Sequence, residues 1–316
     1  MARHDVTLET DGAVLAGTLT LPEAPTPAPV VVGVHGAEGG TREFHLLRHL
    51  EATLPPTGIG TLLFDRRGEG ESTGEGEASY DQLAADVRAW LQHLARDPRV
   101  ERIGLWGISQ GGWIAPLAAA GSSDVEFLVA VSPAGVTPGV QMDFAVRALM
   151  REAGHGDDAV DHALALRRAM DEVSAGRMPV AEAQVLLDRA AGEPWFGLVF
   201  VPPDASVVDA SWAEEMEFDI RPALRRLDLP VLLFFGEHDR WIPVAESADV
   251  WRAELGPDAD LTVVSLPGTG HAATFAADPS DWLEHGPVSP DYERALLAWL
   301  HARLARTPRG SGLPQP

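Results

Sequence analysis

Short apolar runs alternate with segments of helical period along most of the chain. Six runs of strand length are rich in Val, Ile, Leu and Phe, and they cover residues 30–35, 59–65, 103–108, 127–132, 230–236 and 261–266. Continuous apolar runs are typical of strands buried on both faces, as in a parallel sheet. Amphipathic helical patterns lie between them, at residues 43–54, 80–96, 113–120, 244–255 and 292–304. The pattern predicts an α/β fold with helices on both faces of the sheet.

The N-terminal region has a different period. Residues 5–10 and 14–21 alternate apolar and polar positions around Asp11-Gly12, which is a hairpin signal. We therefore expect a mostly parallel sheet that begins with antiparallel strands.

The alternation of strands and helices stops between residues 137 and 227. No buried strand is indicated there, whereas residues 142–153, 158–174 and 180–191 have helical patterns. We predict an α/β core at residues 1–136 and 228–306, a mainly helical insertion at 137–227, and a flexible tail rich in Pro, Gly and Ser at 307–316. Large apolar side chains in the insertion either line a pocket or pack it, and packing is the favoured role for each: Trp195, Phe196, Phe200, Trp212, Met216 and Phe218.

Composition narrows the function classes. The 316 residues are 45% hydrophobic, enough for a sizeable core, and 47 acidic against 24 basic residues give a net charge of -23. This charge repels phosphate backbones and anionic lipids, so we expect no nucleic acid and no membrane as partner, although charge alone names no substrate. The partner expected from the motifs below is a small-molecule acyl substrate, and a homodimer is left open. A charged N-terminus and the lack of a long apolar run predict a soluble, cytoplasmic protein. The chain has no cysteine, which excludes a thiolate nucleophile and cysteine-ligated zinc.

Residues 107–111, GISQG, fit the G-x-S-x-G pattern between a predicted strand and a predicted helix. Such a turn holds its serine at a strained backbone angle, and a side chain at position 107 or 111 would collide with the adjoining elements. Ser109 is thus a candidate nucleophile, the alternative being a turn serine. A serine hydroxyl is weakly nucleophilic, so it needs a histidine base and a carboxylate that orients the histidine.

Candidates for both partners follow later strands. Glu237 and Asp239 come after the run at 230–236, and His271 comes after the run at 261–266. The carboxyl ends of parallel strands meet at one edge of a sheet, where ligands bind in open α/β folds. The three groups are therefore expected at the same edge, with Asp239 favoured over Glu237 as the acid.

An oxyanion hole requires backbone N–H groups near the serine. The residue after the nucleophile, Gln110, supplies one, and the Gly-rich turn after His35 supplies the second, with the Ala37 amide favoured over that of Glu38. His35 itself is expected to brace this turn. His45 and His49 have the spacing of a helical metal pair but lack the zinc-protease pattern, so we expect no metal and no cofactor.

Four segments together resemble the α/β-hydrolase fold serine hydrolases, of the bacterial esterase and serine-aminopeptidase-like kind. They are VHGAEGG, FDRRGEGEST, WGISQGG, and the pair GEHDRWIP with GTGHA. The resemblance implies an α/β-hydrolase fold in which Ser109 is the nucleophile, Asp239 the acid and His271 the base. It also implies a cap formed by the insertion and a structural role for the turn at residues 65–72.

The expected reaction is acyl transfer without a metal, through an acyl-enzyme intermediate. A carboxylesterase ranks first, because ester cleavage asks least of the leaving-group machinery, while thioesterase, lactonase or peptidase specificity stays open. Two alternatives remain at this point. One is an acyl transferase or cyclase whose cap excludes water, and the other is a non-catalytic binding module on the same fold.

Overall fold

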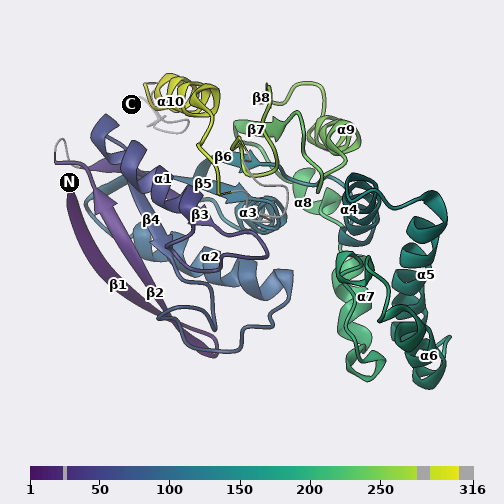
Figure 1. Ribbon diagram of the computed structural model, residues 1–316. Coiled ribbons are helices and arrows are strands. Elements are labelled where there is room, and N and C mark those ends of the chain that lie inside the picture. Colours follow the sequence, from purple (N-terminus) through teal and green to yellow (C-terminus); the bar gives the residue numbers. More distant parts are fainter. Residues whose placement is uncertain (24–26, 276–284, 306–316) are drawn as a thin grey trace.

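A computed structural model describes residues 1–23, 27–275 and 285–305. The predicted tail at 307–316 lies outside the described residues. An eight-stranded sheet forms the centre of the molecule, with the strand order β1-β2-β4-β3-β5-β6-β7-β8 (Figure 1). The strands are β1 (Ala2–Thr10), β2 (Ala13–Leu21), β3 (Ala28–Val34), β4 (Gly60–Phe64), β5 (Val100–Ile108), β6 (Val125–Val131), β7 (Val231–Gly236) and β8 (Leu261–Leu266).

One strand of the sheet, β2, runs opposite to all the others. β1 and β2 form an antiparallel hairpin through Asp11-Gly12, and β2 also pairs antiparallel with β4. The pairs from β4 through β3, β5, β6 and β7 to β8 are all parallel. The predicted mostly parallel sheet with antiparallel N-terminal strands is confirmed. Burial explains the two sequence patterns. The alternating strand β1 lies at the edge of the sheet and is partly open to solvent, whereas every residue of the continuously apolar strand β3 is buried.

Helices cover both faces of the sheet. On one face lie α2 (Tyr80–Leu94), α3 (Gly111–Ala119), α8 (Arg221–Leu224) and α9 (Val244–Leu255), whose buried side chains, among them Trp90 and Trp251, join one core. On the other face, α1 (His45–Thr53) and α10 (Pro290–Leu304) form a second core that includes Leu47 and Leu300, and η1 (Pro55–Thr57) follows α1. Figure 1 shows α10 and α1 on the side of the sheet away from α2.

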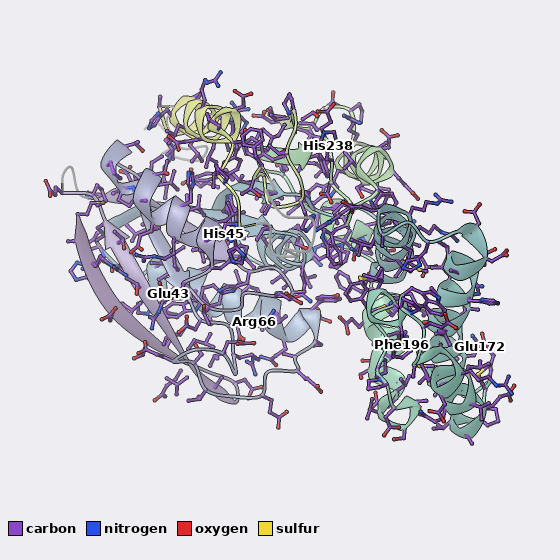
Figure 2. The ribbon with its side chains drawn as sticks, in the orientation of Figure 1. Glu43, His45, Arg66, Glu172, Phe196 and His238 are labelled. Carbon is purple, nitrogen blue, oxygen red and sulfur yellow. The ribbon has the colours of Figure 1, made fainter. Side chains whose placement is uncertain are left out.

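We call residues 137–227, between β6 and β7, the cap. It contains α4 (Pro138–Glu152), α5 (Asp157–Ser174), α6 (Val180–Ala190), α7 (Ala210–Met216) and α8, with the single turns η2 (Phe196–Leu198) and η3 (Ala205–Val207). Helices α4 to α7 stand together beside the sheet, and Glu172 and Phe196 lie in this group while Arg66 and His238 lie on the core (Figures 1 and 2).

The cap has a hydrophobic core of its own, built from side chains such as Val146, Leu164, Met170 and Leu187. Trp195 is buried in that core, as expected for a packing residue. The helices α7 and α8 were not indicated by the apolar pattern, because both are too short for a helical period to stand out. None of the helices that the structure describes is long and apolar enough to cross a membrane.

Candidate active site

Ser109 occupies the sharp turn between β5 and α3. Its φ of 54° lies in the left-handed region that residues with a Cβ rarely adopt, and its backbone N–H donates a 3.0 Å hydrogen bond to the Val131 carbonyl. The glycine requirement is confirmed on both sides. A Cβ on Gly107 would stand 2.4 Å from the Gly111 carbonyl oxygen, and a Cβ on Gly111 would stand 2.6 Å from that of Val34. The strand and helix therefore meet closely enough to present the serine at the carboxyl edge of the sheet.

His271 and Asp239 meet at this same edge. The Nδ1 atom of His271 lies 2.9 Å from Oδ2 and 3.1 Å from Oδ1 of Asp239. The backbone N–H groups of Trp241 and Ile242 donate to Oδ1 at 2.8 and 3.0 Å, and the Asp239 side chain is fully buried. A carboxylate held in this way fixes the ring of the histidine and leaves Nε2 as the atom that can exchange a proton with a substrate or a serine.

The rival acid lies elsewhere. Glu237 is exposed, and its Oε2 accepts a 2.8 Å hydrogen bond from the Gly268 amide rather than from a histidine. The structure thus places Asp239, and not Glu237, against His271.

His35 is buried and lies outside the lining of the main cavity. Burial, aided by the positive charge of Arg66, lowers the pKa of His35 to about 4. Its imidazole is therefore neutral at ordinary pH.

The two helical histidines have structural contacts. His49 lies 3.2 Å from a carboxylate oxygen of Glu293 and links α1 to α10. The ring centroid of His45 lies 4.5 Å from that of Phe44, with the two ring planes tilted by 59°. In the described ranges, no three His, Asp or Glu side chains gather as a metal site would need.

The turn after β3 lies directly against Ser109. A Cβ on Gly36 would stand 3.5 Å from the Ser109 Cβ, and Ala37 and Glu38 line the same cavity as the serine. Arg66 holds this turn: its guanidinium donates to the carbonyls of Gly36 and Ala37 at 3.1 and 2.9 Å. The same group donates to the side-chain Oε1 of Gln110 at 3.3 Å. Arg66 therefore braces both segments whose amides, at Ala37 and Gln110, are the candidate oxyanion donors.

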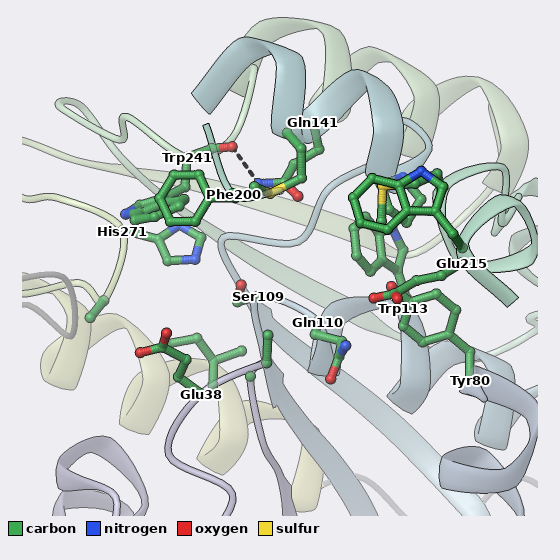
Figure 3. Close-up of a pocket in the computed structure, with 18 of the residues that line it drawn as sticks. Glu38, Tyr80, Ser109, Gln110, Trp113, Gln141, Phe200, Glu215, Trp241 and His271 are labelled. Atoms are coloured by element: carbon green, nitrogen blue, oxygen red, sulfur yellow. Dashed lines mark hydrogen bonds between the residues drawn. The ribbon is translucent and has the colours of Figure 1, made fainter. Parts of the chain in front are cut away.

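A cavity of about 350 Å³ opens above Ser109, between the core and the cap. Ser109, Gln110 and His271 line it from the core (Figure 3). Most of its other walls are large apolar side chains, among them Phe44, Trp113, Met142, Phe200, Trp212, Met216 and Trp241. Phe200, Trp212 and Met216 thus line the cavity, and Phe200 and Trp212 also pack against the cap core, as had been favoured.

Two residues that no sequence motif indicated position the site. Ser132 has a φ of 47° at the end of β6, and its hydroxyl donates a 2.7 Å hydrogen bond to the backbone carbonyl of His271. From the cap, the Gln141 amide donates at 2.8 Å to the carbonyl of Trp241, in the loop that carries Asp239 (Figure 3). The sequence gives little indication of these two roles, because each hydrogen bond joins segments that are far apart in the chain.

The turn at residues 65–72 has the structural role expected of it. The Asp65 carboxylate accepts hydrogen bonds from the amides of Arg42 and Glu71, at 2.8 and 2.9 Å. Arg67 pairs with Asp86 through two 2.7 Å contacts.

Comparison with known proteins agrees with this geometry. A 2-(acetamidomethylene)succinate hydrolase of Mesorhizobium japonicum is 30% identical over 216 residues, which cover 67% of this chain and 71% of that protein. An sn-1-specific diacylglycerol lipase of Mus musculus, ABHD11, is 34% identical over 149 residues, and the match spans less than half of either protein, 46% of each. The Pyrococcus furiosus esterase Pf2001 has a similar fold, with a TM-score of 0.63 at 18% identity over 95% of this chain and 91% of that one. A sequence model of the alpha/beta hydrolase family matches residues 31–285, and this chain belongs to that family.

Proposed function

We propose that this protein is a serine hydrolase that cleaves carboxylic esters through an acyl-enzyme on Ser109. One observation carries the proposal: a serine in a left-handed turn shares an apolar cavity with an imidazole whose other nitrogen is held by a buried aspartate. That is the set of parts that nucleophilic acyl transfer requires.

In the first half of the proposed reaction, His271 Nε2 takes the proton of the Ser109 hydroxyl as its oxygen attacks the ester carbonyl. Asp239 stabilises the imidazolium, and the amides of Gln110 and Ala37 bind the developing oxyanion. The tetrahedral intermediate collapses, the bond to the alcohol oxygen breaks, and His271 returns its proton to the departing alcohol. The acyl group is then bonded to Ser109.

In the second half, His271 removes a proton from a water molecule that attacks the acyl-enzyme. Collapse of the second intermediate releases the carboxylic acid and returns the proton to Ser109. Arg66 supports the oxyanion hole indirectly. Its hydrogen bonds to the carbonyls of Gly36 and Ala37 fix the orientation of the peptide groups that carry the neighbouring amides.

Hydrolysis of an ester is favoured over the other acyl-transfer reactions by the apolar walls and by the relatives. Among the relatives reported above, one is named a hydrolase, one a lipase and one an esterase. The apolar lining suits an acyl chain rather than a highly charged substrate.

The test is turnover of a substrate panel of esters, thioesters, lactones and aminoacyl amides, ranked by kcat/KM. We expect the esters to rank first and to give a pre-steady-state burst of alcohol equal to the enzyme concentration, as an accumulating acyl-enzyme produces. A higher kcat/KM for an amide or a thioester would instead assign a peptidase or a thioesterase of the same family. Ring formation without free acid, on a substrate with a tethered hydroxyl, would contradict hydrolysis.

A further inference from the structure

The cavity has two unlike ends. In Figure 3, Ser109 lies in the middle, with His271, Trp241 and Phe200 on one side and Tyr80, Trp113 and Glu215 on the other. Tyr80 is the first residue of α2 in the core, and Glu215 lies on α7 of the cap. The far end is therefore built jointly by the two parts of the molecule, and it contains a carboxylate among apolar walls.

The proposed mechanism determines which part of the substrate lies at each end of the cavity. In the proposed mechanism His271 protonates the departing alcohol, so the alcohol must lie on the His271 side. The acyl part then extends from the carbonyl toward Tyr80 and Glu215.

Polar side chains from the core and the cap lie together at the far end. Arg66 donates to Oε1 of Gln110, which directs the amide nitrogen of Gln110 the other way. Burial and the negative charge of Glu215 raise the pKa of Tyr80, and its hydroxyl also interacts with the Gln110 side chain. An ionised carboxylate only accepts hydrogen bonds, and a single hydroxyl such as that of Tyr80 can fill one of its acceptor positions. Acceptor positions of the Glu215 carboxylate are therefore left for a ligand.

The neighbouring charge does not use that acceptor capacity. Arg167 is buried and lines the cavity, but its guanidinium is held by Asp143 at 3.2 Å and by the carbonyls of Val199 and Phe200 at 3.1 and 3.2 Å. Glu215 is an exposed residue although it lines the cavity. Desolvation nevertheless raises the pKa of its carboxyl, against the Tyr80 hydrogen bond and the Arg167 charge. A donor on a substrate therefore competes with water for the carboxylate, and it gains from the part of the site that is desolvated.

We propose that Tyr80 and Glu215 form a specificity-determining site that selects acyl groups carrying a hydrogen-bond donor, a hydroxyl or an ammonium group, at the end remote from the ester. The inference rests on the proposed function for the orientation of the substrate. It concerns which acyl group is preferred, and the chemistry at Ser109 is a separate matter.

The experiment compares three series of p-nitrophenyl esters with acyl chains of six to ten carbons, ending in a methyl, a hydroxyl or an ammonium group. At the chain length that reaches Glu215, we expect kcat/KM for a donor-ended ester to exceed that of its methyl-ended partner by about tenfold or more. A larger gain for the ammonium or for the hydroxyl series identifies the donor. Equal values at every length would overturn the proposal.

The readout in variants is the ratio of kcat/KM for donor-ended and methyl-ended esters, which does not depend on the fraction of active enzyme. We expect this ratio to fall to about one in Glu215→Leu and to decrease partly in Tyr80→Phe, which keeps the ring but removes the hydroxyl. Glu214→Leu is the matched control, since Glu214 is exposed like its neighbour Glu215 on the same helix but lies outside the cavity lining. An unchanged ratio in Glu215→Leu, or an equal fall in Glu214→Leu, would contradict the proposal.

A binding measurement separates this inference from the proposed function. The dissociation constants of donor-ended and methyl-ended acyl amides for Ser109→Ala protein can be followed by tryptophan fluorescence, since Trp113, Trp212 and Trp241 line the cavity. Tighter binding of the donor-ended amides supports the site even if no ester is cleaved. Equal binding would contradict it even if every ester is cleaved.

Discussion

The core and the cap place their side chains in the cavity by different means. In the core, backbone geometry does the positioning: Ser109 stands in a left-handed turn, and two amides hold Asp239. In the cap, side chains from α4, α5, α7 and the segment around Phe200 reach the cavity, and they are held by one another and by packing. This difference supports our proposal that the core carries the reaction, while the cap contributes to the choice of substrate. The two parts can therefore be perturbed separately.

The largest effect is expected at the nucleophile. Ser109→Ala should lower kcat by a factor on the order of 10⁶, because no other group in the proposed mechanism can form the acyl-enzyme. Its melting temperature should stay at or above that of the wild type, since alanine removes a hydroxyl and keeps the Cβ. Ester turnover and thermal unfolding measure the two parts, and residual turnover near the wild-type rate would assign the reaction to another residue.

The next effect concerns the acid. Asp239→Asn should lower kcat by about 10⁴, because the amide favours the wrong tautomer of His271 while the loop geometry is kept. Glu237→Gln is the matched control two residues earlier. Steady-state kinetics should show little change there, since Glu237 is exposed and accepts its hydrogen bond from the Gly268 amide rather than contacting His271 among the described residues. A reversed order of these two variants would move the acid role to Glu237.

The buried histidine His35 predicts how the stability of the folded core depends on pH. Its pKa of about 4 in the folded protein lies below the ordinary 6.5, so the unfolded chain binds the proton more readily between these values. The folded state should therefore lose up to about 3 kcal/mol of stability from this group as pH falls from about 6.5 to 4. Urea unfolding at both pH values measures the free energy of unfolding of the wild type and of His35→Asn. An equal loss of this free energy in the two proteins between pH 6.5 and 4 would contradict the buried neutral imidazole.

Ser132 is predicted to position the catalytic histidine without contacting the substrate. Ser132→Ala removes the hydroxyl that holds the His271 carbonyl, and a small displacement of the imidazole should lower kcat by about 10- to 100-fold with little change in KM. Ser247→Ala is the matched control, because Ser247 is equally buried and its hydroxyl has no hydrogen-bond partner among the described residues. Equal kinetic losses in both variants would indicate a general packing effect.

The smallest effect is expected in the cap. Met142→Ala enlarges the cavity and should change the ratio of kcat/KM for long and short acyl esters by at most about tenfold. Met178→Ala, in a cap residue that packs on the cap core and lies outside the cavity lining, should leave the ratio unchanged. A loss of all turnover in Met142→Ala would show that the cap takes part in the reaction itself.

Much of the core could be predicted because its signals are local. The apolar runs mark the strands, and the glycines at 107 and 111 mark a turn in which a side chain has no room. Asp239 and His271 could be expected at one edge because both follow parallel strands, and the structure brings them into contact.

The remaining features depend on contacts between distant segments. Arg66 looks like part of a structural turn, and its hold on Gly36, Ala37 and Gln110 appears only when two loops meet. The approach of Glu215 to Tyr80 likewise depends on how α7 packs on the core, and α7 has too few residues to show a period. Local patterns carry no information on such pairs.

The most direct test of the central claim is covalent labelling with a fluorophosphonate, followed by peptide mapping. Such a probe reacts with a serine that a neighbouring base activates. The account predicts stoichiometric labelling of the wild type at Ser109, slow labelling of Asp239→Asn, and none of Ser109→Ala. Absence of labelling in the folded wild-type protein, or labelling at a different serine, would contradict it.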